Sequence, residues 1–278
     1  MSGLGPLTMR ELKKWYRNPV FLITGLIQPF FWIALFGSAF DFTKLFGAFT
    51  LPGVSVTSEV KVALDGAPNY ITYIVGGVLT ITGLFTAMFA GTNIIFDRRL
   101  GPMGRFLSSP IRRSSIVLSK ILSATFRILP QALILVVAAL VIPNGLVFQN
   151  GFNVFDGLVI VAAVILISFI FSSIFSVIAI RMTNMNSIFG IVNLVNLPLM
   201  FVSYAMFAPG MMATWLSNLA QYNPVSWSAE AMRTVIIYGN STTLSQWSQI
   251  GWWLGGLAIL AAALILFTAY MAEKEIRD

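Results

Sequence analysis

Six long apolar runs constrain the fold of this chain more than any other feature. They cover about Val20–Phe40, Tyr70–Phe96, Ile116–Ile142, Phe155–Ile180, Ile188–Phe207 and Ile250–Met271. About 20 apolar residues in a helix cross a hydrocarbon core roughly 30 Å thick. The sequence therefore predicts an all-α polytopic membrane protein with six transmembrane helices, organised as one transmembrane domain over residues 1–278. A cleaved signal peptide is disfavoured, because the first run exceeds the signal's apolar core of about 7–15 residues.

The composition supports a bilayer as the solvent of this protein. Only 10% of its residues are charged and 57% are hydrophobic, whereas soluble domains have roughly 25% charged residues. The chain has no Cys and no His, which excludes disulfides, thiolate zinc sites and a histidine general base. The net charge of +7 does not indicate nucleic acid, because the charges lie in clusters between apolar runs and not over one solvated face.

The distribution of Lys and Arg predicts the orientation. With the N-terminus in the cytoplasm, the inner segments hold 13 of the 17 basic residues: Arg10, Lys13, Lys14, Arg17, Arg98, Arg99, Arg105, Arg112, Arg113, Lys120, Arg181, Lys274 and Arg277. The outer segments hold only Lys44, Lys61 and Arg233. Cytoplasmic loops carry the excess of positive charge in membrane proteins. We therefore expect a multi-pass protein of the cell (plasma or inner) membrane with both termini in the cytoplasm.

Residues 1–19 are predicted to form an amphipathic helix in the membrane interface. Met9, Leu12 and Trp15 recur at helical spacing, and Thr8 and Glu11 have the spacing of a capping box. This helix is expected to act as a membrane anchor and topology signal or to have a mechanical role.

The segment 97–113 predicts a short cytoplasmic helix between the second and third spans. Gly101-Pro102 breaks the descending helix and starts a new one, which Pro110 ends. Met103, Phe106 and Leu107 fall on one side of it. Apolar side chains on a solvated tip cost free energy unless they are covered, so they favour docking of a partner protein. A loop held inside by its arginines is the simpler alternative.

Two further features of the sequence join this segment in resembling a known family. "FDRRLGPMGRFLSSPIRRSSIVLSKIL" resembles the cytoplasmic segment of ABC type-2 permeases, the drug-resistance and polysaccharide-export permeases, through Leu107, Ser109, Pro110, Ile111, Arg113 and Lys120. "YNPVSWSAEAMR" is similar to the family's Asn-Pro…Glu-x-x-Arg signature, and "LPLMFVSYAMFAP" resembles the end of its fifth span. The resemblance covers nearly the whole chain. Gly76-Gly77, where the family often has Pro-Gly, and the long first outer loop depart from it.

The resemblance implies a permease subunit of an ATP-driven exporter. Such a subunit forms a homo- or heterodimer with a second permease copy, has its substrate pathway at the dimer interface, and couples to two separate ABC ATPase subunits. ATP and Mg would bind to those partners, because this chain has no G-x-x-x-x-G-K-[ST] phosphate loop. The chain itself is expected to be no enzyme and to hold no cofactor. The implied ATPase-coupling residues are Met103, Arg105, Phe106, Leu107, Pro110 and Arg112.

The segment 209–248 is predicted to form two outer re-entrant half-helices. Its two apolar helical runs are each about 10–14 residues long, too short to span a bilayer. Asn223-Pro224 lies between them, and Glu230 and Arg233 are one helical turn apart and able to pair. The pair either keeps the segment at the membrane surface or, with Asn223 and Pro224, closes an outer gate. Reversal of both charges together is expected to restore activity if they pair.

Polar residues inside the spans have structural explanations at this stage. Arg127 lies two turns beyond Lys120 and is expected to extend back to the inner surface. Ser168, Ser172 and Ser176 recur every four residues, which favours close packing of the fourth span.

Three other functions compete with an exporter subunit. A secondary transporter needs ionisable residues near the midplane, and no carboxylate lies in the middle of a run. A membrane enzyme needs an assembled catalytic constellation, which the sequence does not suggest. A non-transporting subunit that relays ATPase motion stays open, and the substrate is not indicated.

Overall fold

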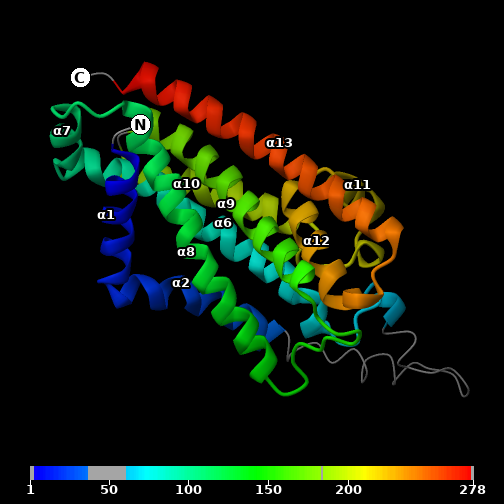
Figure 1. Ribbon diagram of the computed structural model, residues 1–278. Coiled ribbons are helices and arrows are strands. Elements are labelled where there is room, and N and C mark those ends of the chain that lie inside the picture. Colours follow the sequence, from blue (N-terminus) through cyan, green and yellow to red (C-terminus); the bar gives the residue numbers. More distant parts are fainter. Residues whose placement is uncertain (1–2, 37–60, 183, 277–278) are drawn as a thin grey trace, which may run out of the picture.

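The computed structural model describes residues 3–36, 61–182 and 184–276, and Figure 1 shows them as a bundle of helices. The helices are α1 (Leu4–Tyr16), α2 (Pro19–Phe31), α6 (Tyr70–Arg99), α7 (Pro102–Leu107), α8 (Arg113–Val141), α9 (Val154–Arg181), α10 (Met185–Phe201), α11 (Thr214–Ala220), α12 (Pro224–Tyr238) and α13 (Leu244–Glu275). A π-helical turn, η1 (Trp32–Phe36), continues α2, and two 3₁₀ turns, η2 (Pro209–Met211) and η3 (Gly239–Ser241), flank α11 and α12.

Within the described residues, four helices are long and apolar enough to cross a membrane: α6, α8, α9 and α13. The shortest of them, α9, has 28 residues, which at about 1.5 Å per residue exceeds the roughly 30 Å hydrocarbon core. The expected first and fifth spans fall on the shorter apolar helices α2 and α10, of 13 and 17 residues. Each contains a proline, Pro29 or Pro198, which removes a helical hydrogen bond. Residues 37–40 of the expected first span lie outside the described residues.

Helix α6 is the centre of the bundle and packs against α8, α9 and α12. Small residues bring α9 close to it: a Cβ atom added to Gly91 would lie 2.5 Å from the Phe175 carbonyl oxygen. On the facing helix, Ser172 and Ser176 are fully buried, and the Ser168 hydroxyl lies 3.3 Å from that of Thr125 on α8. Lipid tails are as apolar as Leu, so close packing is what holds membrane helices together. The predicted packing role of the serines is confirmed.

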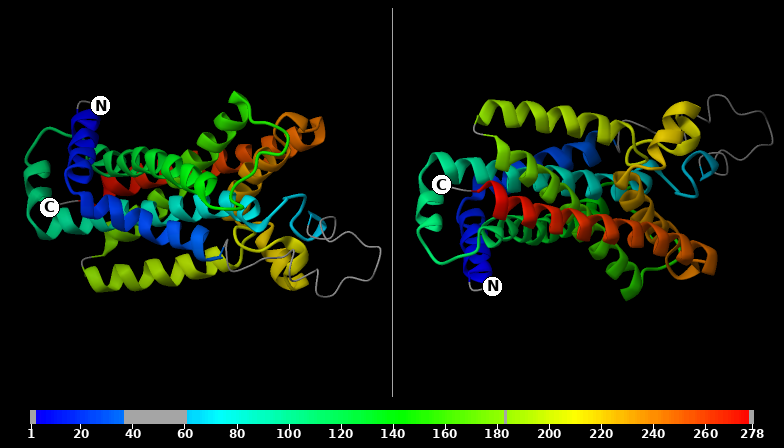
Figure 2. Two further views of the ribbon diagram at one scale, coloured as in Figure 1. Left: turned by 90° about the horizontal axis from the view of Figure 1, so that it is seen from below. Right: turned by 90° about the horizontal axis from the view of Figure 1, so that it is seen from above.

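The outside of the bundle is strongly apolar. On α13, Trp252, Ile259 and Leu266 are more than two-thirds exposed, and α8 exposes Leu133 and Val141. Figure 2 shows α10 lying along one side of the bundle, and its exposed side chains are also apolar. A soluble monomer rarely has so much contiguous apolar surface, so these faces suit lipid or a partner helix.

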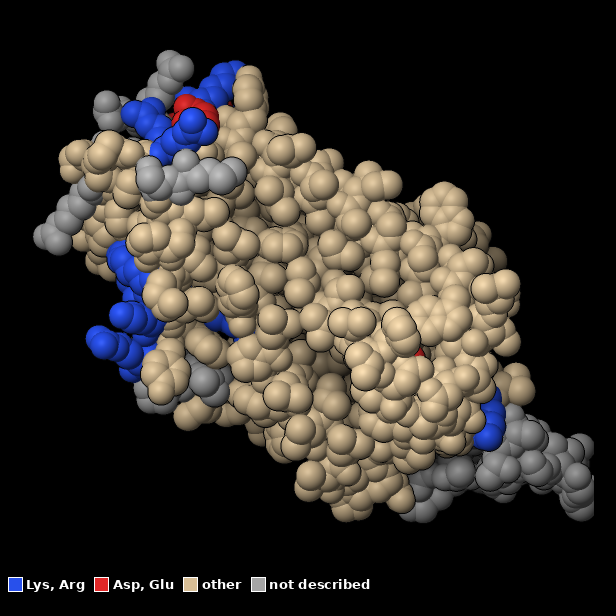
Figure 3. Space-filling view, in the orientation of Figure 1, with Lys and Arg blue, Asp and Glu red and all other residues tan. Residues whose placement is uncertain are grey.

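The two segments of functional interest lie at opposite ends of the molecule. Figures 1 and 2 place α1, α7 and the C-terminus at one end, which we call the α1 end. Helices α11 and α12 lie at the other, the α12 end. On the face shown in Figure 3, Lys and Arg gather mainly at the α1 end, and the long middle is almost free of charge.

Helix α1 is bound to the bundle and not only to the membrane surface. It packs on α8, and its Glu11 is 2% exposed. The expected capping box is wrong: α1 begins at Leu4, and the Thr8 hydroxyl donates to the Leu4 carbonyl oxygen at 2.8 Å. Glu11 faces basic side chains of the bundle, so tertiary charge pairing replaces the local cap.

Candidate functional site

Helix α7 is the short helix that the sequence predicted between the second and third spans. Gly101 precedes it with a φ of 91°, and Pro102 occupies its first turn. A φ of this sign suits glycine and costs other residues free energy, and proline fits the first turn because its missing N–H has no helical partner there. The Gly101-Pro102 pair therefore turns the chain at the α1 end.

The structure corrects the expected apolar tip of α7. Met103 is 4% exposed and belongs to the chain's own core. Phe106 is half-buried, and the Arg10 guanidinium lies over its ring at 4.7 Å from the centroid, a cation–π contact. Both side chains are covered because α1 passes beside α7, which no local pattern indicates. The side chains of Arg105 and Leu107 lie outside the described part of the structure.

Other residues form the exposed surface around α7. Pro110 and Arg112, both predicted to couple to a partner, are exposed. Leu100, which the sequence interpretation missed, is 75% exposed directly before Gly101. Its position at the end of a predicted span, beside a helix break, is a signal that was available in the sequence.

Six charged side chains from three helices meet at the α1 end, and we call them the charge cluster. They are Arg10, Glu11 and Lys14 of α1, Asp97 of α6, and Lys120 and Arg127 of α8. The centre is the ion pair between Lys120 and Asp97. Lys120 also lies 3.5 Å from Glu11, and Lys14 lies 3.3 Å from Asp97. The cluster thus joins α1 to the two helices that α7 connects.

The cluster is largely removed from solvent. Lys120, Glu11 and Asp97 are each at most 3% exposed, and Arg127 is 7% exposed. Breaking a buried ion pair by removing one partner typically costs about 3–5 kcal/mol, because the other charge is left without compensation. The position of α1 is therefore fixed by these pairs.

The structure changes the roles expected for Arg127 and Asp97. Arg127 extends toward the α1 end as predicted, but it reaches no surface: its Nη2 donates to the Glu11 backbone carbonyl oxygen at 2.9 Å. Asp97 was expected to cap the helix after it, yet it lies inside α6 and pairs with Lys120. Both corrections have one cause, the position of α1 against α6 and α8.

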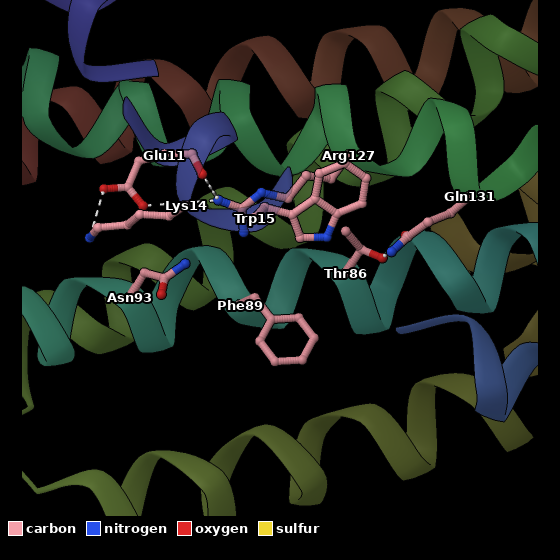
Figure 4. A pocket seen from close by; sticks show the side chains of 8 residues that line it. All are labelled: Glu11, Lys14, Trp15, Thr86, Phe89, Asn93, Arg127 and Gln131. Carbon is pink, nitrogen blue, oxygen red and sulfur yellow. Dashed lines mark hydrogen bonds and ion pairs between the residues drawn. The ribbon is translucent and has the colours of Figure 1, made fainter. Parts of the chain in front are cut away.

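A cavity of about 90 Å³ lies beside the charge cluster. Figure 4 shows its lining, with Arg127 extended toward Glu11 and Phe89 pointing away from Arg127. At its far side, the Thr86 hydroxyl of α6 donates to the Gln131 side-chain oxygen of α8 at 2.7 Å. This bond is the kind of interhelical polar contact that holds membrane helices together.

At the α12 end, the two predicted half-helices are present as α11 and α12. Asn223 caps α12 by accepting from the Val225 N–H at 2.9 Å, and it donates to the Leu199 carbonyl oxygen of α10 at 2.8 Å. Pro224 occupies the first turn, and Gly239 ends the helix with a φ of 45°. Asn223-Pro224 therefore starts α12 and ties it to α10.

Arg233 is the main anchor of α12. It is 1% exposed and pairs with Glu230. It also donates to the carbonyl oxygens of Tyr73 at 3.2 Å and Tyr204 at 2.6 Å, and its guanidinium lies 3.6 Å from the Tyr73 ring centroid. The predicted pair is thus present, but it does not hold the segment at the surface. It fixes α12 to α6 and to the turn after α10.

Gly76 and Gly77 explain how α12 approaches α6 so closely. A Cβ atom at Gly76 would lie 3.0 Å from the Ala229 carbonyl oxygen of α12. At Gly77 it would lie 1.6 Å from the Ala205 carbonyl oxygen, which no side chain can tolerate. The departure from the family's Pro-Gly pattern therefore has a packing role in this chain.

Comparison with known proteins adds the family context. The sequence profile of the family described as ABC-2 type transporter matches residues 4–237. A protein of Pyropia yezoensis named "Putative transport permease ycf38" is 26% identical over 275 residues, covering 98% of this chain and 87% of that protein. Proteins of the same name from Porphyra purpurea and Cyanophora paradoxa are 26% and 25% identical over 279 and 230 residues, covering 98% and 82% of this chain and 87% and 71% of the relatives.

Proposed function

Because the chain belongs to the ABC-2 type transporter family, we propose that it is the membrane-spanning permease subunit of an ATP-driven exporter. Two separate ABC ATPase subunits would supply ATP hydrolysis with Mg, and a second permease copy would complete the transport unit. The relatives' printed name, a transport permease, agrees with this function. The observation that carries the proposal is the turn at α7, which presents exposed residues at the most basic end of the molecule.

The proposed topology has six spans: α2 with η1, α6, α8, α9, α10 and α13. The gathering of Lys and Arg at the α1 end supports a cytoplasmic position for that end, including both termini. The α12 end would then face outward across the plasma or inner membrane. Trp215 and Tyr222 are more than 60% exposed there, and such aromatic side chains favour the headgroup region of a bilayer.

The exposed surface around α7 is the proposed contact for the ATPase. Leu100, Pro110 and Arg112 would supply it, since Met103 is buried in the chain's own core. An exposed Leu beside a basic rim is a common composition for the centre of an interface. Motion of α7 would pass into α6 and α8, which it joins, and through the charge cluster into α1.

Helix α10 supports a substrate pathway between two copies of this chain. It exposes Leu194, Leu197 and Phe201. It also contains Asn196, which is 2% exposed and whose two amide atoms have no hydrogen-bond partner among the described residues. A buried polar group without a partner is costly, so a partner copy or a substrate would offset that cost.

The outer gate would be formed by α11 and α12 with unequal freedom. Arg233 fixes α12 in the bundle, while α11 exposes Trp215 and Leu219. Short helices can shift without breaking hydrogen bonds along a whole span. We therefore assign the wall of the gate to α12, with Asn223, Pro224, Glu230 and Arg233, and its movement to α11.

One alternative is a subunit that relays ATPase motion without transport. It would bind the ATPase in the same way, but its ATPase rate would not respond to any substrate. A secondary transporter is less consistent with the structure, because the buried carboxylates Glu11 and Asp97 lie at one end of the bundle, whereas ion-coupling sites lie near the midplane.

Co-purification with the ATPase tests the proposed coupling surface. Leu100→Asp is expected to lower the amount of bound ATPase about tenfold or more, because a carboxylate in an apolar contact is desolvated without a partner. Leu244→Asp is the matched control, since Leu244 is also exposed, 87% against 75%, but lies at the α12 end. Equal ATPase recovery with both variants would refute the surface. Transport that continues without the ATPase would refute the proposed function itself.

A further inference from the structure

The cavity beside the charge cluster is large enough for a polyatomic ligand. It lies between α1, α6 and α8, and its polar lining includes Lys14 of α1, Asn93 of α6, and Arg127 and Gln131 of α8. Its volume of about 90 Å³ is well above the roughly 15 Å³ that one ordered water requires. The space therefore has room for a small charged group.

The charges around this cavity do not balance. The cluster has four cationic side chains and only two carboxylates among the described residues, so two positive charges are in excess. Two of the cations, Lys14 and Arg127, line the cavity directly. Excess charge of one sign in a desolvated place is unfavourable, and an anion in the cavity would offset it.

Arg127 has a donor left for such an anion. Its Nη2 is engaged with Glu11, but its Nε is buried and has no hydrogen-bond partner among the described residues. A buried N–H without an acceptor costs free energy. The planar guanidinium matches the oxygen geometry of carboxylates and phosphates, so the free donor suits an oxyanion.

The same cavity also has an apolar side. Trp15 of α1 and Phe89 of α6 contribute to its lining. Trp favours the headgroup depth of a bilayer, and a basic amphipathic helix in the interface attracts anionic lipid. An amphiphile with a phosphate headgroup satisfies both sides of the cavity, whereas a free ion satisfies only one.

We propose that this cavity binds the phosphate headgroup of an anionic phospholipid from the leaflet in which α1 lies. The phosphate would accept from Arg127 and Lys14, and it would join α1 to α6 and α8 next to the turn at α7. Binding requires neither ATP nor a transported substrate, so its outcome is independent of the proposed transport function.

Lipid titration of the purified full-length protein tests the site. Short-chain dioctanoyl phosphatidylglycerol is added in detergent, and both the melting temperature and lipid adducts in native mass spectra are recorded. Lys14→Gln is expected to weaken apparent binding about tenfold, the factor for one charge-assisted hydrogen bond. Its side chain is 49% exposed, so the fold should survive. Arg127→Lys keeps the charge but loses the Nε donor, and should weaken binding similarly.

Three comparisons decide the result. Arg181→Gln removes a positive charge that pairs with Glu275 outside the cavity, and it should leave binding unchanged. Inorganic phosphate alone and dioctanoyl phosphatidylcholine should not raise the melting temperature at concentrations where phosphatidylglycerol does. An equal effect of free phosphate would overturn the lipid source, and an equal effect of phosphatidylcholine would overturn the need for an anionic headgroup. Equal losses in Arg181→Gln and Lys14→Gln would overturn the site.

Discussion

Replacing Arg233 with Ala is expected to destabilise the protein by about 3–5 kcal/mol, the usual cost of leaving one partner of a buried ion pair uncompensated. The loss includes the bonds to Tyr73 and Tyr204 as well as the pair with Glu230. Thermal stability in detergent, followed by size-exclusion chromatography of heated samples, measures it. Arg181→Ala is the control, because its pair with Glu275 has side chains 63% and 36% exposed and exposed pairs contribute about 0–1 kcal/mol.

The structure also changes the expected result of exchanging the two charges. A carboxylate at position 233 cannot donate to the Tyr73 and Tyr204 carbonyl oxygens, so Glu230→Arg with Arg233→Glu should not restore stability. Recovery of the melting temperature by this double variant, or equal stability of Arg233→Ala and Arg181→Ala, would contradict the anchoring role of Arg233.

At the scale of elements, the contact of α6 with the turn after α10 depends on the absence of a side chain at position 77. Gly77→Ala would place a Cβ atom 1.6 Å from the Ala205 carbonyl oxygen, so the backbone must move. Overpacking of this kind typically costs about 1–3 kcal/mol. We expect a lower melting temperature and, because α12 shifts with the turn, reduced transport.

Gly255→Ala is the matched control for this helix contact. Gly255 lies inside α13, and a Cβ atom there meets nothing within 4 Å. Alanine in a helix interior is favoured over glycine by roughly 0.5–1 kcal/mol, so this variant should be as stable as the original protein or more stable. If Gly77→Ala behaves in the same way, the close approach of α6 is not needed for stability.

At the scale of the whole molecule, the two ends of the bundle should lie on opposite sides of the membrane. The chain has no Cys, so single cysteines report position without background. Gly104→Cys in α7 and Gly210→Cys in η2 are both exposed and have open space at the Cβ position. In intact cells an impermeant maleimide should label only position 210, and after permeabilisation it should label both.

Two results would contradict this topology. Labelling of position 104 in intact cells would reverse the orientation, and labelling of both positions from one side would mean an odd number of spans between them. Orientation follows from the Lys and Arg bias, so the experiment tests that inference independently of function.

The sequence by itself determined the features that depend on neighbouring residues. The apolar runs fixed the length of α6, α8, α9 and α13, because a bilayer forces backbone groups into helices. Gly101-Pro102 set the start of α7, and Asn223-Pro224 set the start of α12, through local dihedral and capping preferences. The short motifs, which read along the chain, also gave the family resemblance that the profile match confirms.

Only the tertiary structure decided which charges meet and which apolar residues are covered. Arg127 bonds to Glu11 across 116 positions of the chain, and Lys14 meets Asp97 across 83. Local periodicity carries no information on such pairings, so Glu11 was assigned to a cap and Asp97 to another. Met103 was expected on an exposed tip for the same reason, since its burial depends on how α7 folds back onto the bundle. Helix ends follow from local rules, whereas a buried charge finds its partner through packing, which alone brings distant segments within a few ångströms.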